Sequence, residues 1–489
     1  MQQHLAFGGG ASQSVLGPAV LVIMILAIVL MFVLPRKYVI IPFFIALFLS
    51  PAGQEVYIGG VHLFVTRILI LSGWIRLIAS KVSGRKIWAE ITSLDKLFFV
   101  WAVFRALAFI IRYPQSGAIV YQTGFLIDAL GGFFLIRALI RDDEDIDRVI
   151  KLFAGITVVL AITMGYEELT GVNLFGIIGH VVMVPDLRNG YVRAMGPFEH
   201  PLLAGAFVAT LVPLFFWLWK GRKSRVLAIL GIVAAGIAGL TTQCSTPILG
   251  YGAAILALCF WPFRKRMRMV RWGIVGTLVG LQLVMKANVW WIIQHFDVIG
   301  GSSGWHRAEL VDVFLKAFPK WWLIGTSNNA NWGFMTWDTL NQYVQEGEQG
   351  GLLVFALFIS LICVCFSWLG KARRSAGDDR PRQWYFWALG AALFANVVVY
   401  FGVSYFDQTK FAWYALLAII AAATAPLRAA KTAPQEDASP SAVRRFWVPA
   451  VGPVEPAGLF SNSSHGDQPR SRALRCAVPG ATHTVNRNL

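Results

Sequence analysis

Two arginines stand in polar segments that connect long apolar runs. Arg193 lies in NGYVRAMGPFEHPLLAG, which covers 189–205, and Arg307 lies in GWHRAELVD, which covers 304–312. A guanidinium presents a planar fork of N–H donors that suits phosphate oxygens, so Arg193 is a candidate ligand for a phosphate or diphosphate. A snorkelling or helix-capping role is the structural alternative for Arg193, and an ion pair with a carboxylate on the same helix is the alternative for Arg307.

Several ionisable residues close to these segments could move a proton. His200 and Glu199 directly precede Pro201, which suits the first turn of a helix, so we expect both within reach of a ligand bound at that helix start. Glu346 or Asp338 could act as a general base toward a sugar hydroxyl. An acidic residue in the first turn of a helix is a sufficient structural reason for Glu346.

Polar and aromatic residues are concentrated in the long segment that contains Arg307. Asn341 and Gln342, with Gln345 and Glu346 after them, predict a polar surface just outside a bilayer that could contact an acceptor. Seven tryptophans occur in the same segment, and they either anchor it at the lipid headgroups or stack on sugar rings. They are Trp290, Trp291, Trp305, Trp321, Trp322, Trp332 and Trp337.

The elements that must position these residues are apolar helices. Of the 489 residues, 56% are hydrophobic and 14% are charged, and the mean hydropathy is +0.60, which excludes a soluble enzyme. The apolar runs predict about twelve or thirteen transmembrane helices in residues 1–427. The runs lie near 18–34, 38–50, 61–79, 97–111, 118–136, 149–165, 201–219, 226–240, 247–262, 272–287, 350–369, 384–403 and 411–427.

The basic residues are unevenly shared between alternate connections. Connections at 35–37, 76–96, 137–151, 220–225, 263–271 and 370–383 hold 25 Lys and Arg, whereas the opposite set holds 8. Because cytoplasmic connections carry the excess of Lys and Arg, we place the first set in the cytoplasm and the N-terminus outside. This topology accounts for the net charge of +17, so no nucleic-acid partner is expected.

Two long connections, 166–199 and 288–349, then lie outside, the second between the tenth and eleventh spans. The five cysteines lack the spacing of a metal site or a disulfide framework, and we expect no metal. The end of the chain, 428–489, is rich in Pro, Ala, Arg and Ser, which predicts a disordered cytoplasmic tail. The first apolar run has no basic segment before it and is interpreted as a retained span.

These motifs resemble the O-antigen ligase and O-antigen polymerase superfamily of bacterial envelope glycosyltransferases. The resemblance rests on Arg193 with MGPFEHPLLAG after it, on GWHR ending at Arg307, and on NQYVQEGEQGG at 341–351, and it covers about 150–370. It implies a multi-pass protein of the bacterial inner membrane. It also implies transfer of a glycan from a polyprenyl-diphosphate carrier to an acceptor hydroxyl, without a metal or another cofactor.

The resemblance also assigns roles and partners. Arg193 and Arg307 would hold the diphosphate, and the acceptor would be a second carrier-linked glycan in a polymerase or lipid A-core in a ligase. Two departures matter: Cys244-Ser-Thr-Pro stands where the family has Ser-Arg-Gly, and Leu340-Asn341 stands where it has His-Asn. His200, His306 or Glu346 would have to replace the missing histidine. The absence of that histidine favours a polymerase over a ligase. A transporter or flippase of lipid-linked saccharide, and a family member without catalysis, are the alternatives.

Overall fold

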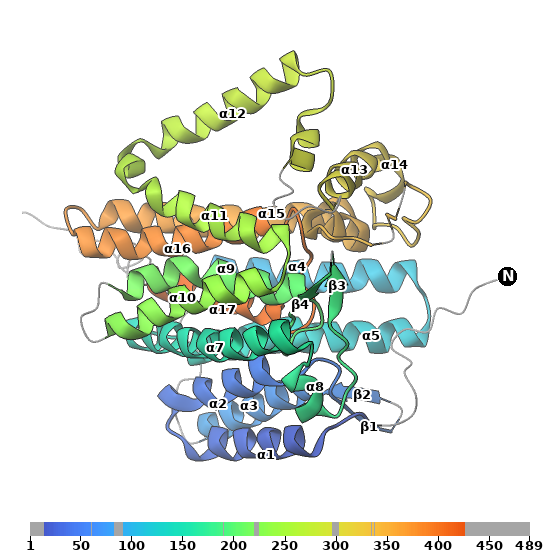
Figure 1. Ribbon diagram of the computed structural model, residues 1–489, viewed down its shortest axis with the longest axis vertical. Helices are drawn as coiled ribbons and strands as arrows, with labels where there is room; N and C mark the ends of the chain where they lie inside the picture. The colour runs from blue at the N-terminus through green and yellow to red at the C-terminus, as the bar shows by residue number, and fades with distance from the viewer. Residues whose placement is uncertain are drawn as a thin grey trace, which may run out of the picture. The chain divides into compact units, whose positions relative to one another are not determined.

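The computed structural model describes residues 14–59, 61–82, 91–188, 190–219, 224–295, 303–333, 335–336 and 338–425 (Figure 1). These residues are mostly helical, which confirms the all-α class. Two small antiparallel hairpins are the exceptions: β1 (Glu55–Ile58) pairs with β2 (Val61–Phe64), and β3 (Asp186–Arg188) pairs with β4 (Tyr191–Arg193). The predicted tail at 428–489 and Trp337 lie outside the described residues.

Every apolar run identified in the sequence contains a helix. The helices up to 218 are α1 (Pro18–Val33), α2 (Arg36–Leu49), α3 (Val65–Val82), α4 (Ser93–Arg112), α5 (Ser116–Leu126), the π-helical turn η1 (Ile127–Gly131), α6 (Gly132–Leu139), α7 (Asp143–Thr170), α8 (Leu174–Gly179) and α9 (Pro201–Leu218). The later helices are α10 (Arg225–Thr241), α11 (Ser245–Cys259), η3 (Trp261–Arg266), α12 (Met267–Val284), η4 (Val289–His295), α13 (Ser303–Lys316), α14 (Phe318–Trp321), α15 (Gln342–Ser375), α16 (Arg380–Val399) and α17 (Thr409–Ala423).

Four of the described helices are long and apolar enough to cross a membrane by themselves. They are Ser116–Leu139, which joins α5, η1 and α6, and the helices α7, α9 and α15. The pair Ser245–Cys259 and Trp261–Val284, bent by 71°, makes a fifth if it is one span. The apolar helices α1, α10 and α17 are shorter. A span count of twelve or thirteen therefore stays a prediction.

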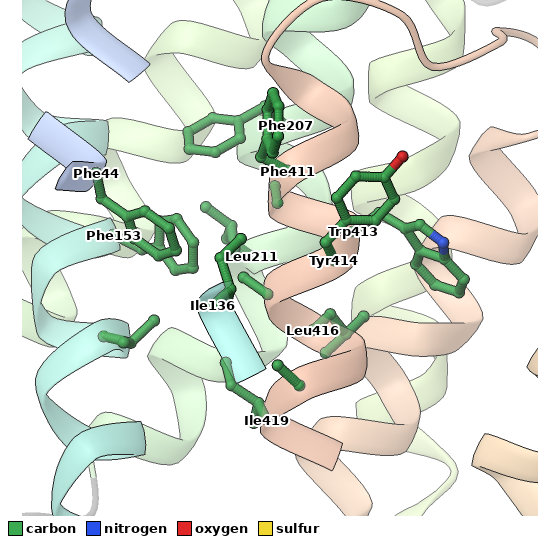
Figure 2. Packing of buried hydrophobic residues seen from close by; sticks show 14 of the residues in the cluster. Phe44, Ile136, Phe153, Phe207, Leu211, Phe411, Trp413, Tyr414, Leu416 and Ile419 are labelled. Atoms are coloured by element: carbon green, nitrogen blue, oxygen red, sulfur yellow. The ribbon is translucent and has the colours of Figure 1, made fainter. Parts of the chain in front are cut away.

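Helix α17 forms the centre of the core. All its residues except Lys410 are buried, and it packs against α6, α7, α9, α15 and α16. Phe411, Trp413 and Tyr414 project from it among aromatic and aliphatic side chains of the neighbouring helices (Figure 2). A helix that is apolar on all sides needs such enclosure, by protein or by lipid.

The connections between the helices meet at two ends of the bundle. At one end, which we call the site end, Ala52 N–H and Gln408 Nε2 both donate to the Pro197 carbonyl, and Gln54 donates to the Gly179 carbonyl. The site end comprises the connections near 51–64, 113–115, 171–200, 242–244, 322–341 and 400–408. Figure 1 shows both hairpins, α8, α13 and α14 gathered there.

At the opposite end, which we call the basic end, arginines pair with acidic residues of other connections. Arg36 lies 3.0 Å from Asp145, and Arg382 lies 2.6 Å from Asp143. These contacts bring together three of the connections that hold the excess of basic residues, 35–37, 137–151 and 370–383.

The segment predicted as a large loop has a folded interior of its own. In α13 and α14, Leu310, Phe314 and Trp321 pack with Val344 in a small apolar cluster, and Trp321 stacks on Phe314 with ring centroids 4.1 Å apart. This segment is therefore partly helical, and its apolar side chains pack against the start of α15.

Candidate functional site

Arg193 ends strand β4 and is buried, with 8% of its surface exposed. It forms an ion pair with Asp186, its partner in the β3–β4 register, and its Nη2 donates to Cys244 Sγ at 2.8 Å. The short hairpin thus delivers the guanidinium to the connection between α10 and α11. Burial raises the pKa of Cys244, although the charges of Arg193 and Arg188 oppose that rise. Its thiol is therefore neutral, and the anion paired with Arg193 is the carboxylate of Asp186, whose side chain is 50% exposed.

The backbone that follows Arg193 is held by a buried carboxylate. Glu167, near the end of α7, accepts hydrogen bonds from the N–H groups of Met195 at 3.3 Å and Gly196 at 2.9 Å. Asn173 donates to both Glu167 Oε1 and the Gly196 carbonyl. Gly196 has φ = +57°, a left-handed conformation that glycine adopts without cost. These bonds keep the segment between Arg193 and α9 in one shape.

His200 is the N-cap of α9, as its place before Pro201 predicts. Its Nδ1 accepts a hydrogen bond from Leu202 N–H at 3.1 Å, which leaves Nε2 as the protonated nitrogen of the ring. Burial lowers the pKa of His200 to about 4, and the nearby charge of Arg193 acts in the same direction. The imidazole is therefore neutral at pH 7, and it suits donation from Nε2–H better than proton abstraction.

Glu199 lies beside the connection between α16 and α17. Its N–H donates to Asp407 Oδ2 at 3.0 Å. Burial raises the pKa of Asp407 to about 7, and Glu199 contributes to that rise. The Glu199 residue is exposed, yet partial burial of its carboxyl group raises the pKa, and the charge of Lys410 opposes that rise. Glu199 is thus the accessible carboxylate closest in the chain to His200.

Glu346 is enclosed rather than accessible. It is fully buried at 0% exposure, and Trp101 Nε1 donates to its Oε2 at 2.9 Å. Arg105 and Gln342 donate to its Oε1 at 3.1 Å and 2.7 Å. Because both oxygens are engaged, this arrangement makes Glu346 the partner of a buried arginine, and it offers no path to a sugar hydroxyl.

Asn341 and Gln342 anchor α15 instead of forming a polar surface. They are 1% and 5% exposed, so the prediction of a surface here is wrong. Asn341 Oδ1 caps α15 by accepting from the N–H of Tyr343 at 2.9 Å. Gln342 N–H donates to the Tyr400 carbonyl, and Gln342 Oε1 accepts from Tyr405 N–H. Their polarity satisfies backbone groups at the junction with 400–405, a need that the sequence pattern does not reveal.

Arg307 and His306 lie together on α13. Arg307 is 4% exposed, and His306 Nε2 is 3.4 Å from the Asp338 carbonyl oxygen. Burial raises the pKa of Asp338, and the charge of His306 opposes that rise. These residues therefore belong to the folded interior of the α13–α14 segment.

The structure sorts the predicted site residues into three groups. Arg193 and His200 form the first, Asn341, Gln342 and Glu346 the second, and Arg307 and His306 the third. The connection 400–410 joins the first two groups, because Gln408 holds Pro197 while Tyr405 holds Gln342. In the described part of the chain, no group of three or more His, Cys, Asp and Glu residues could hold a metal ion.

Sequence reasoning missed two cations near the first group. Arg188, on strand β3, acts on Cys244 together with Arg193, and the charge of Lys410, the second residue of α17, acts on Glu199. Arg188 is five residues before Arg193, and a hairpin can bring residues at this spacing together. The sequence therefore contained a signal that could have identified Arg188. For Lys410 the sequence contained no signal beyond its place directly before the last apolar run, 411–427.

No protein-family model matches this chain, and no curated protein matches it.

Proposed function

We propose that this protein is an envelope polysaccharide polymerase or ligase, which transfers a glycan from a polyprenyl-diphosphate carrier to an acceptor sugar hydroxyl at the outer leaflet of the bacterial inner membrane. The observation that supports it best is the pair Arg193 and Arg188 around the neutral Cys244, with the neutral imidazole of His200 beside them. Such a group suits a diphosphate at the ends of apolar helices.

In this proposal the acceptor oxygen attacks the anomeric carbon, the bond from that carbon to the phosphate oxygen breaks, and the carrier diphosphate leaves with the electron pair. Arg193 and Arg188 stabilise the negative charge that develops on the leaving oxygen. His200 donates a hydrogen bond from Nε2 to an oxygen of the leaving diphosphate. The acceptor proton passes to Glu199, which is exposed, whereas Glu346 is enclosed by its partners.

A reconstitution experiment tests this function. The full chain in liposomes receives a polyprenyl-diphosphate-linked repeat unit, with and without lipid A-core, and the products are separated by size. Longer carrier-linked chains identify a polymerase, and transfer only in the presence of core identifies a ligase. The Arg193→Ala variant should lose at least about a hundredfold in rate because it removes a charge-assisted contact to the leaving group.

The control for this variant is Arg374→Ala, which removes an exposed arginine from the basic end. It should transfer glycan at the rate of the unsubstituted chain. If Arg193→Ala, present at normal level, makes chains of normal length and rate, the proposed role of Arg193 is wrong.

The buried ion pairs of Arg67 with Asp128 and of Arg105 with Glu346 favour one second candidate, a transporter or flippase of lipid-linked saccharide. Movement of the labelled repeat unit across the liposome bilayer without any covalent product would identify it.

A further inference from the structure

Lys410 is carried to the site end by the most enclosed helix of the protein. It is the second residue of α17, and every other residue of that helix is buried. The side chain of Lys410 is 24% exposed. Because α17 packs against α6, α7, α9, α15 and α16, with Phe411 and Tyr414 among the packed side chains (Figure 2), the core fixes the backbone of Lys410.

The ammonium group of Lys410 shares one carboxylate with an arginine. Lys410 Nζ lies 2.9 Å from Asp128 Oδ2, while Arg67 donates from Nε to Oδ1 at 3.2 Å and from Nη2 to Oδ2 at 3.3 Å. Asp128 is 7% exposed at its side chain and Arg67 is 16% exposed. Two cations on one anion leave this cluster, Arg67–Asp128–Lys410, with a formal charge of +1.

The backbone around the cluster has two local features, a π-helical turn at Asp128 and a glycine that leaves room for Arg67. Asp128 belongs to η1, a five-residue π-helical turn between α5 and α6, and such turns occur frequently at functional sites. A Cβ atom at Gly124 would lie 2.7 Å from Arg67 Cζ, so the helix must carry glycine where the guanidinium passes. The Phe64 ring covers the same guanidinium at 4.9 Å.

Lys410 follows a turn that is hydrogen-bonded to the segment carrying His200. The charge of Lys410 acts on the Glu199 carboxylate, whose backbone N–H is bound by Asp407 at the start of the same turn. An ammonium group has three N–H donors, and Asp128 accounts for one of them in this arrangement. Glu199 is the acidic side chain of that segment on which the charge of Lys410 acts.

We propose that the ammonium group of Lys410 is a further cation for the carrier diphosphate, and that Arg67 and Asp128 hold it in position. This inference rests on the proposed function, because it takes the ligand to be a lipid-linked diphosphate. Lys410 then supplies a positive charge that the segment Cys244-Ser-Thr lacks, because that segment contains no arginine. Glu199 competes with the diphosphate for Lys410.

Binding of farnesyl diphosphate tests the proposal directly. The full chain is placed in phosphatidylcholine nanodiscs, which add no anionic lipid, and binding is followed by titration calorimetry. Lys410→Ala should weaken binding about tenfold or more, since a hydrogen bond between charged groups is lost. Lys410→Arg should stay within about threefold, and Glu199→Gln should bind at least as tightly as the unsubstituted chain because an acidic competitor is removed.

Lys316→Ala is the matched control, because Lys316 also forms an ion pair with an aspartate, Asp312 at 2.6 Å, but on α13. It should bind farnesyl diphosphate with unchanged affinity. Inorganic pyrophosphate, titrated in the same way, should bind more weakly than the lipid if the site takes a lipid headgroup, and equal affinity would overturn that assignment. Thermal midpoints of all variants show whether each is folded.

Normal binding by Lys410→Ala would overturn the proposal. It would also be overturned if Lys410→Arg and Lys410→Ala lose affinity equally with matching losses of thermal stability, since that pattern belongs to packing. No binding by the unsubstituted chain would overturn it as well. Glycan transfer in the reconstitution above is decided independently, so binding that depends on Lys410 without any transfer refutes the proposed function and leaves this site standing.

Discussion

At the scale of single residues, His200 links protonation to the start of a helix. Its Nδ1 can accept from Leu202 N–H only while that nitrogen is unprotonated, and the helix α9 begins immediately after it. An N-cap contributes about 1 kcal/mol to stability. The low pKa of this imidazole is therefore a consequence of the fold with a measurable effect on the fold.

The sign of that effect can be predicted. The pKa of His200 is about 4 in the folded protein, against the ordinary histidine value of 6.5 in the unfolded chain. The unfolded chain therefore binds more protons than the folded protein between pH 4 and pH 6.5. Stability from His200 is present above pH 6.5 and is lost as the pH falls toward 4. At pH 5 we expect a loss of about 1–2 kcal/mol.

The measurement is the thermal midpoint of the purified protein in detergent at pH 7.5 and pH 5. His200→Asn keeps a capping oxygen that does not titrate, so its midpoint should fall less between the two pH values. Equal falls for both proteins would show that His200 is not the titrating group.

At the scale of elements, a glycine fastens the α13–α14 segment to α15. Gly325 has φ = +82°, and a Cβ atom there would lie 2.0 Å from the Glu348 carbonyl oxygen. Arg112, at the end of α4, donates to the carbonyls of Ile324 at 2.9 Å and Glu348 at 2.7 Å. Three elements therefore meet at one close backbone contact.

Gly325→Ala should destabilise the protein by more than about 2 kcal/mol, because it adds a backbone clash to the 1–2 kcal/mol cost of a left-handed conformation. Gly171→Ala is the control: Gly171 has φ = +71° but open space around its Cβ position, so only the conformational cost applies. Thermal midpoints and tryptic cleavage at Lys316 and Lys320 measure both effects. Equal losses in the two variants would contradict the role of the close contact.

At the scale of the whole molecule, the two ends of the bundle should face opposite sides of a membrane. In a variant without its native cysteines, Leu187→Cys on β3 marks the site end and Asp378→Cys marks the basic end; both positions are exposed. A membrane-impermeant maleimide should label residue 187 in intact spheroplasts and residue 378 only after permeabilisation. The reverse pattern would contradict the orientation with the N-terminus outside.

The location of the helices is a property that the amino-acid sequence determines by itself. Each apolar run contains a helix because helices satisfy their backbone hydrogen bonds locally, whatever the rest of the chain does. The count of Lys and Arg predicts that the connections fall into two sets on opposite sides of a membrane, and this topology stays a prediction. His200 as an N-cap could also be predicted, because Pro201 marks the first turn of its helix.

Only the tertiary structure decided which polar residues are accessible. The sequence predicts Glu346 at a polar surface. In the structure it forms a buried ion pair with Arg105, which lies 241 positions away in the chain. Lys410 and Asp128 are 282 positions apart and meet because α17 packs against α6. Partners at such separations depend on how helices pack, and a buried charge is stable only with its partner. Arg193 was recognisable from its segment and Arg188 from its spacing in a local hairpin, whereas the place of Lys410 required the packed helices.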